Sequence, residues 1–170
     1  AGVVAVGQVA FAAQTGAANP FNDVNVGSVR GEGAPSFADL DRDGDFDAIV
    51  GDFDGNLHYF LNTGSAIAPA FTEQAGAANP FNGVSMGGGS NPSFADLDGD
   101  GDLDAIVGTI FGTLRCFKNT GSAIALVFTE QAGAANPFNG VDVGDRSAPS
   151  FADLDGDGDV DAVVGENYGT

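Results

Sequence analysis

Residues 96–104 read DLDGDGDLD, which places five carboxylates within nine residues. Nearly the same string recurs as DLDRDGDFD at 39–47 and as DLDGDGDVD at 153–161. These three strings contain 15 of the 24 acidic residues, so most of the net charge of −19 is local. Two carboxylates about 4 Å apart repel by roughly 1 kcal/mol in water, and by about 4 kcal/mol at an effective dielectric constant of 20. The strings therefore indicate a cation that offsets this repulsion.

The acidic strings belong to a longer repeat. The motif PSFADLD begins at Pro35, Pro92 and Pro149, with a spacing of 57 residues both times. The motif NTGSAIA begins at Asn62 and Asn119, which are also 57 residues apart. We therefore divide the chain into an N-terminal strand segment with a linker, two complete repeats and a truncated third repeat, at 1–34, 35–91, 92–148 and 149–170.

Each repeat has the pattern of four short β-strands. In the second repeat we expect them at 93–95, 103–108, 114–117 and 127–131, with turns between them. No segment combines helical periodicity with caps, so we expect almost no helix. Four short antiparallel strands per repeat are typical of a β-propeller blade. The predicted fold class is all-β: tandem four-stranded antiparallel β-propeller-type blades, in about three repeats of 57 residues.

The spacing within each acidic string is that of a cation-binding loop. Counted from Asp96, aspartates occupy positions 1, 3, 5, 7 and 9, and glycine occupies position 6. Oxygens at positions 1, 3 and 5 converge when the chain curls, and the glycine permits a sharp turn. Position 7 then contributes its main-chain oxygen and leaves its side chain in solvent, whereas the apolar positions 2 and 8 anchor the loop. A helical EF-hand is excluded, because its acidic position 12 falls on Val50, Val107 and Val164.

Calcium is the ion that we expect at these loops. The strings offer only hard oxygen ligands, which disfavours zinc and copper, and Mg²⁺ prefers fewer protein ligands. The alternatives are an acidic turn without an ion and a catalytic pair of carboxylates, although equivalent loops lack the two contrasting environments that acid–base catalysis needs. We expect about three Ca²⁺ ions per chain, held by Asp39, Asp41, Asp43, Asp45, Asp47, Asp96, Asp98, Asp100, Asp102, Asp104, Asp153, Asp155, Asp157, Asp159 and Asp161.

The unit FADLDGDGDLDAIVG at 94–108, followed by GTLRCFKNTGSA at 112–123, resembles the FG-GAP/VCBS repeat family. This family includes the propeller blades of integrin α subunits and many bacterial surface proteins. The resemblance implies a Ca²⁺ loop between the first two strands of each blade, in which Asp45, Asp102 and Asp159 act through main-chain oxygen. The segment AANPFN is an addition that the family pattern does not require, and it occurs at 17–22, 77–82 and 134–139.

Three blades are too few to close a propeller, which needs about four. The third repeat lacks a counterpart of LRCFKN at 114–119, so we expect an open strand edge there. The segment 1–11 has the pattern of a strand that completes such a blade. We therefore predict completion by oligomerisation, through edge-strand complementation in a ring or a head-to-tail filament, or else a place in a longer array.

Composition limits the function. The chain is acidic and has no run of basic residues, which disfavours binding to nucleic acid or to anionic membranes. No apolar run approaches the length of about 18 residues that a membrane span needs. We expect a non-enzymatic, Ca²⁺-binding structural or adhesive protein, extracellular or at the cell surface, that associates with itself. The alternative is a propeller module of a larger surface protein, a lectin or adhesin whose partner is a glycan or a surface protein.

Other residues are expected to be structural. Cys116 is the single cysteine, so it forms no intrachain disulfide and is predicted to fill the core. His58 is the single histidine and is predicted to face outward on the third strand of its repeat. The phenylalanines of the PSF and NPF motifs are predicted to pack between blades.

Overall fold

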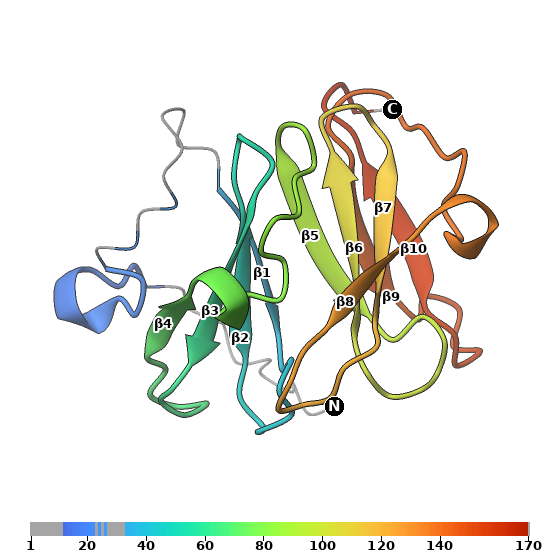
Figure 1. The fold of residues 1–170 in the computed structure, drawn as a ribbon. Helices are drawn as coiled ribbons and strands as arrows, with labels where there is room; N and C mark the ends of the chain where they lie inside the picture. The colour runs from blue at the N-terminus through green and yellow to red at the C-terminus, as the bar shows by residue number, and fades with distance from the viewer. Residues whose placement is uncertain (1–11, 23, 25, 27–32, 170) are drawn as a thin grey trace, which may run out of the picture.

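The structure of the chain, a computed structural model, describes residues 12–22, 24, 26 and 33–169. It contains two four-stranded sheets and one two-stranded sheet, all antiparallel, which follow one another in chain order from teal through yellow to red in Figure 1. This arrangement confirms the predicted all-β fold of tandem blades. The strand expected at 1–11 lies outside the described residues.

The strands of each sheet are consecutive in the chain. The first sheet is formed by β1 (Ala34–Ala38), β2 (Asp47–Gly51), β3 (Leu57–Asn62) and β4 (Phe71–Gln74). The second is formed by β5 (Ser90–Ala95), β6 (Asp104–Thr109), β7 (Leu114–Asn119) and β8 (Phe128–Gln131). The third is formed by β9 (Ala148–Ala152) and β10 (Asp161–Gly165).

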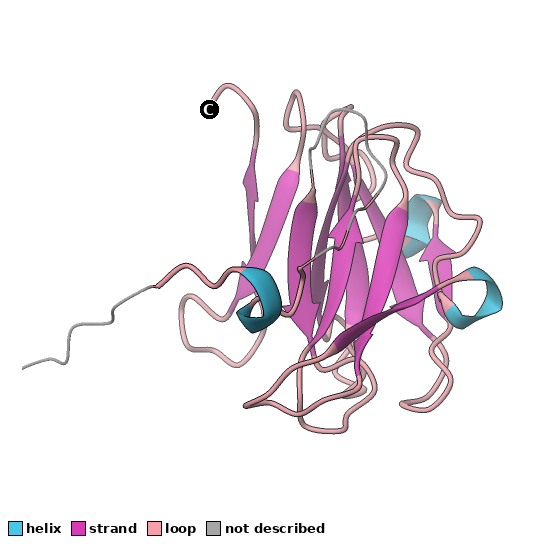
Figure 2. Cartoon of the chain, turned by 90° about the vertical axis from the view of Figure 1, so that its left-hand side faces the viewer, coloured by secondary structure: helices cyan, strands magenta, loops and turns pink. Residues whose placement is uncertain are grey.

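The helical content of the described residues is confined to three short 3₁₀ helices. These are η1 (Gly16–Ala18), η2 (Gly76–Ala78) and η3 (Gly133–Ala135), which lie outside the sheets in Figure 2. Each lies next to or within an AANPFN segment, and each begins with a glycine at positive φ. Among the residues that the structure describes, no helix has the length and apolar character needed to cross a membrane.

The register of the first hairpin is the same in all three sheets. Ser36 pairs with Ile49, Ser93 with Ile106, and Ser150 with Val163. The innermost strands β1, β5 and β9 are neighbours in space, as expected when blades are arranged around a common axis. The three acidic strings are therefore carried by equivalent hairpins.

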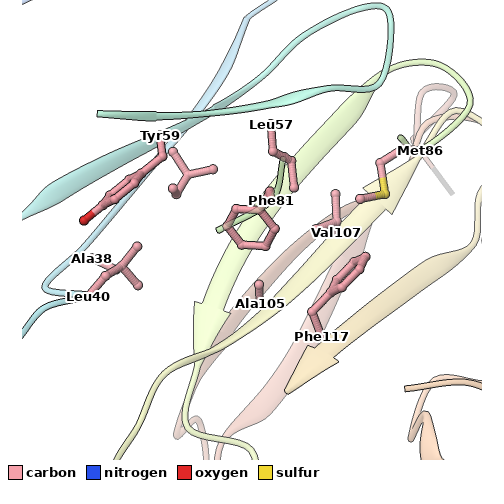
Figure 3. Close-up of a cluster of buried hydrophobic side chains, with 10 residues drawn as sticks. Ala38, Leu40, Leu57, Tyr59, Phe81, Met86, Ala105, Val107 and Phe117 are labelled. Atoms are coloured by element: carbon pink, nitrogen blue, oxygen red, sulfur yellow. The ribbon is translucent and has the colours of Figure 1, made fainter. Parts of the chain in front are cut away.

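The main core lies between the first two sheets, as Figure 3 shows. Leu57 and Tyr59 of β3 belong to the same buried cluster as Val107 and Phe117 of the second sheet. Phe81, from the AANPFN segment between the sheets, is 2% exposed and stacks on Phe128 with ring centroids 4.5 Å apart. The predicted packing of this NPF phenylalanine between blades is confirmed.

Two glycines allow the sheets to approach closely. A Cβ atom at Gly51 would lie 2.0 Å from the carbonyl oxygen of Ser90, and one at Gly108 would lie 2.0 Å from that of Ser147. The two buried serines also bind the preceding sheet, because their hydroxyls donate to the carbonyls of Asn56 and Thr113 at 2.8 Å. These contacts fix each first strand against the blade before it.

Candidate metal centre

The acidic strings form the β1–β2, β5–β6 and β9–β10 connections, and they lie at the same lower edge of the molecule in Figure 1. Each connection curls in the same way. The carboxylate at position 1 accepts the N–H of the glycine at position 6, at 3.1 Å for Asp39, 2.9 Å for Asp96 and 3.2 Å for Asp153. The three donor glycines have φ angles of 95°, 87° and 98°, a region that glycine enters without strain. The predicted role of glycine in the turn is therefore confirmed.

The curl brings three carboxylates together in each loop. Ligand-capable oxygens that lie within 4.8 Å of one another come from Asp39, Asp41 and Asp43 in the first loop and from Asp96, Asp98 and Asp100 in the second. In the third loop they come from Asp153, Asp155 and Asp161. The first two clusters join positions 1, 3 and 5, whereas the third joins positions 1, 3 and 9.

Position 9 ties the first two loops to their own sheets. The Oδ1 atoms of Asp47 and Asp104, which are 1% and 3% exposed, accept the N–H groups of Asn62 and Asn119 at 2.8 Å. Asp47 also accepts the hydroxyl of Tyr59 at 3.0 Å. Burial raises the pKa of Asp47 to about 6, although both of these hydrogen bonds oppose the rise. This clamp was not predicted from the sequence, where its only signal is that NTG recurs with the same period as the acidic string.

The side chain at position 7 does not face solvent in the first loop. Asp45 is 9% exposed, and its burial, followed by the charge of Asp43, raises its pKa. The prediction was wrong here because Asp45 turns inward toward Asn62, while Phe46 at position 8 is 63% exposed. In the second loop, Asp102 instead forms an ion pair with Arg42 of the first loop at 2.6 Å.

The apolar anchors behave differently from loop to loop. Leu40, at position 2 of the first loop, is 4% exposed, and Leu97 packs against a buried cluster between the second and third sheets. Leu103 packs against the cluster between the first two sheets. Leu154 is 64% exposed, because no described segment covers that face of the third sheet. The predicted anchoring is thus confirmed for Leu40, Leu97 and Leu103, whereas Phe46, Leu154 and Val160 are exposed and the prediction is wrong for them.

A model of the FG-GAP-like repeat matches residues 39–107 and 96–164 of the chain. The protein belongs to the FG-GAP-like repeat family. Both matches begin at the first aspartate of an acidic loop and end in the strand after the next loop, one 57-residue period apart. A search of curated protein sequences returns no match to the chain.

The first FG-GAP-like loop contains an oxygen that fits a cation. Asp39 Oδ1 is buried and has no hydrogen-bond partner, and the same holds for Asp45 Oδ1. An unpaired charged oxygen that is shielded from water costs free energy unless a cation or donor satisfies it. Burial is also the largest cause of the raised pKa of Asp41, to which the neighbouring carboxylates add. An oxygen-only donor set of this kind suits Ca²⁺.

Two basic residues near the loops were missed by the sequence analysis. Lys118 of β7 contacts Asp98 and lies 3.6 Å from Asp100, and hydrogen bonding to its ammonium lowers the pKa of Asp98. Arg42 links the first two loops through Asp102. Both contacts depend on the packing of strands and sheets, which a motif of nine residues does not contain.

The remaining predicted residues have structural surroundings. Cys116 is 3% exposed, as expected for a core residue. His58 is only partly exposed, because its ring lies between Asp52 and Glu73 at 3.2 and 3.1 Å. The expectation of a solvent-facing histidine was therefore wrong in part, because Glu73 of β4 and Asp52 of the β2–β3 turn hold the ring against the sheet.

Proposed function

We propose that the chain is a Ca²⁺-stabilised, non-enzymatic structural or adhesive repeat protein of the cell exterior that associates with itself. The observation that carries the Ca²⁺ assignment is the unpaired buried Oδ1 of Asp39, within a cluster that also contains Asp41 and Asp43. Position 1 holds the loop closed through the glycine N–H, so its free oxygen remains available to an ion. The main-chain oxygens at position 7 complete the proposed ligand set.

The proposed exterior location is supported by the type of site. Extracellular Ca²⁺ modules bind with dissociation constants of about 10⁻⁴ to 10⁻³ M, which suits surroundings where Ca²⁺ is millimolar. At ten times the dissociation constant, each bound ion adds about 1.4 kcal/mol to the free energy of unfolding. Several such ions would offset the repulsion within the acidic strings.

Thermal unfolding in Ca²⁺, in Mg²⁺ and with EGTA tests the Ca²⁺ assignment. Circular dichroism of the full chain should show a higher Tm in millimolar Ca²⁺ than with EGTA, and a smaller increase with Mg²⁺. The variant Asp41→Asn keeps the size of the side chain and should lose part of the increase. Equal Tm values in Ca²⁺ and EGTA would refute the assignment.

Self-association rests on the third sheet. Among the described residues β10 pairs only with β9, whereas its counterparts β2 and β6 pair on both sides. Val163 is 56% exposed, although its counterparts Ile49 and Ile106 are fully buried by the following sheet. A surface of this kind is suited to another blade, supplied by a second copy or by further repeats of a longer chain.

Deletion of residues 1–11 tests whether the N-terminal segment of one copy completes the third blade of another copy. Light scattering of the full and the shortened chain should show a larger mass for the full chain. An unchanged mass would contradict strand exchange, while the Ca²⁺ assignment would be unaffected.

A further inference from the structure

The second loop already contains a cation of its own. The ammonium group of Lys118 contacts the carboxylate of Asp98 and lies 3.6 Å from Asp100. These are positions 3 and 5 of the loop, and both belong to the cluster that would hold the metal ion. The lysine side chain is 38% exposed, so it has room to leave the loop.

Among the described residues, no lysine forms such an ion pair with the first loop, although its backbone curls in the same way. Leu61 occupies the place of Lys118 on β3, 57 residues earlier, and borders the same groove as Asp41 and Asp43. An apolar side chain cannot neutralise these carboxylates, and Asp39 Oδ1 remains buried without a partner. The two loops thus differ at this strand position, which is charged beside the second loop and apolar beside the first.

On the basis of the proposed function, we infer that Lys118 is a built-in competitor of Ca²⁺, which makes the second loop a weaker site than the first. An ion that enters the second loop must displace the ammonium group from two of its ligands. It must also tolerate the guanidinium of Arg42, which is paired with Asp102 at position 7. The first loop fills at lower Ca²⁺ concentration, and the protein responds to Ca²⁺ in two stages.

The expected difference follows from the charges. A unit positive charge held about 4 Å from a divalent ion in water would weaken binding about thirtyfold. Because Lys118 is flexible and partly exposed, it retreats toward solvent when the ion binds, which reduces this effect. We expect the dissociation constants of the two loops to differ by about three- to tenfold.

The position 6 glycines provide a separate reporter for each loop. The amide N–H groups of Gly44 and Gly101 donate to the position 1 carboxylates, so their NMR signals should move when the ion binds. A Ca²⁺ titration of the full chain, labelled with ¹⁵N, yields one midpoint for each signal. In the unmodified chain the midpoint of Gly44 should lie about three- to tenfold below that of Gly101.

The chain offers matched variants for this titration. Lys118→Leu copies the residue at position 61 of the equivalent strand and should lower the midpoint of Gly101 toward that of Gly44. Leu61→Lys should raise the midpoint of Gly44, and Lys118→Arg should leave the order of the two unchanged. Dispersed signals from the loop glycines confirm that each variant is folded.

The outcomes separate this inference from the function on which it rests. If both signals respond to Ca²⁺ but Lys118→Leu moves the Gly101 midpoint less than twofold, the competitor role is wrong and Ca²⁺ binding stands. If neither signal moves in any variant, Ca²⁺ binding itself is refuted, and the competitor role with it.

Discussion

Replacement of Phe81 by alanine removes the aromatic ring that links the first two sheets. This side chain is 2% exposed, stacks on Phe128 at 4.5 Å, and meets the edge of Phe117 at 6.2 Å. Truncation of a buried phenylalanine costs about 3–5 kcal/mol, since it removes apolar contacts and leaves a cavity. For a chain of this length, that corresponds to a decrease in Tm of about 6–20 °C.

Phe138 is the matched control for this prediction. It occupies the same place in the next AANPFN segment, but it is only partly buried, and among the described aromatic rings it meets only that of Phe151, with centroids 5.9 Å apart. Phe138→Ala should therefore lower the free energy of unfolding by less than half as much as Phe81→Ala. Urea and thermal unfolding in Ca²⁺ measure both variants. Equal losses, or a loss below about 1 kcal/mol for Phe81→Ala, would refute the idea that the NPF phenylalanine stabilises the contact between complete blades.

Two further predictions concern the sheet junctions and the loop clamp. Gly108→Ala should destabilise the chain by about 2 kcal/mol or more, because the new Cβ atom would lie 2.0 Å from the backbone oxygen of Ser147. At Gly158 a new Cβ atom would have no atom within 4 Å, although the φ of 98° strains any residue with a side chain. Gly158→Ala should therefore lower the free energy of unfolding in urea by less than Gly108→Ala. The pKa of Asp47 is about 6 in the folded chain, above its ordinary value of 3.8, so the folded state binds this proton more tightly than the unfolded state. In metal-free buffer, its contribution should be complete below about pH 4 and should fall by roughly 2–3 kcal/mol as the pH rises to about 7. Asp47→Asn should lack this component, and identical pH profiles for the variant and the unmodified chain would contradict it.

The sequence predicted the strands well where the repeat and the β-branched pattern coincide. The strand expected at 103–108 is observed as β6 (Asp104–Thr109), and the strand expected at 127–131 is observed as β8 (Phe128–Gln131). The first strand of the second repeat was expected at 93–95, but β5 begins at Ser90. Its start depends on the contact of Ser90 with the previous sheet, which local pattern does not encode.

The sequence predicts those features of the candidate site that depend only on residues within one loop. The convergence of positions 1, 3 and 5 in the first two loops follows from spacing and from glycine at position 6. The contact of Lys118 with Asp98 depends on strand register across 20 residues, and the ion pair of Arg42 with Asp102 depends on how two sheets pack. The inward turn of Asp45 likewise depends on Asn62, a residue of another strand.

The number of Ca²⁺ ions bound per chain tests the central claim most directly. Equilibrium dialysis in millimolar Ca²⁺ should yield about three ions per chain, because the residues that the structure describes form three acidic clusters. A variant with Asp39→Asn, Asp41→Asn and Asp43→Asn should bind one ion fewer, since the other two loops are unchanged. Binding of no Ca²⁺ by the folded, unmodified chain would contradict the account.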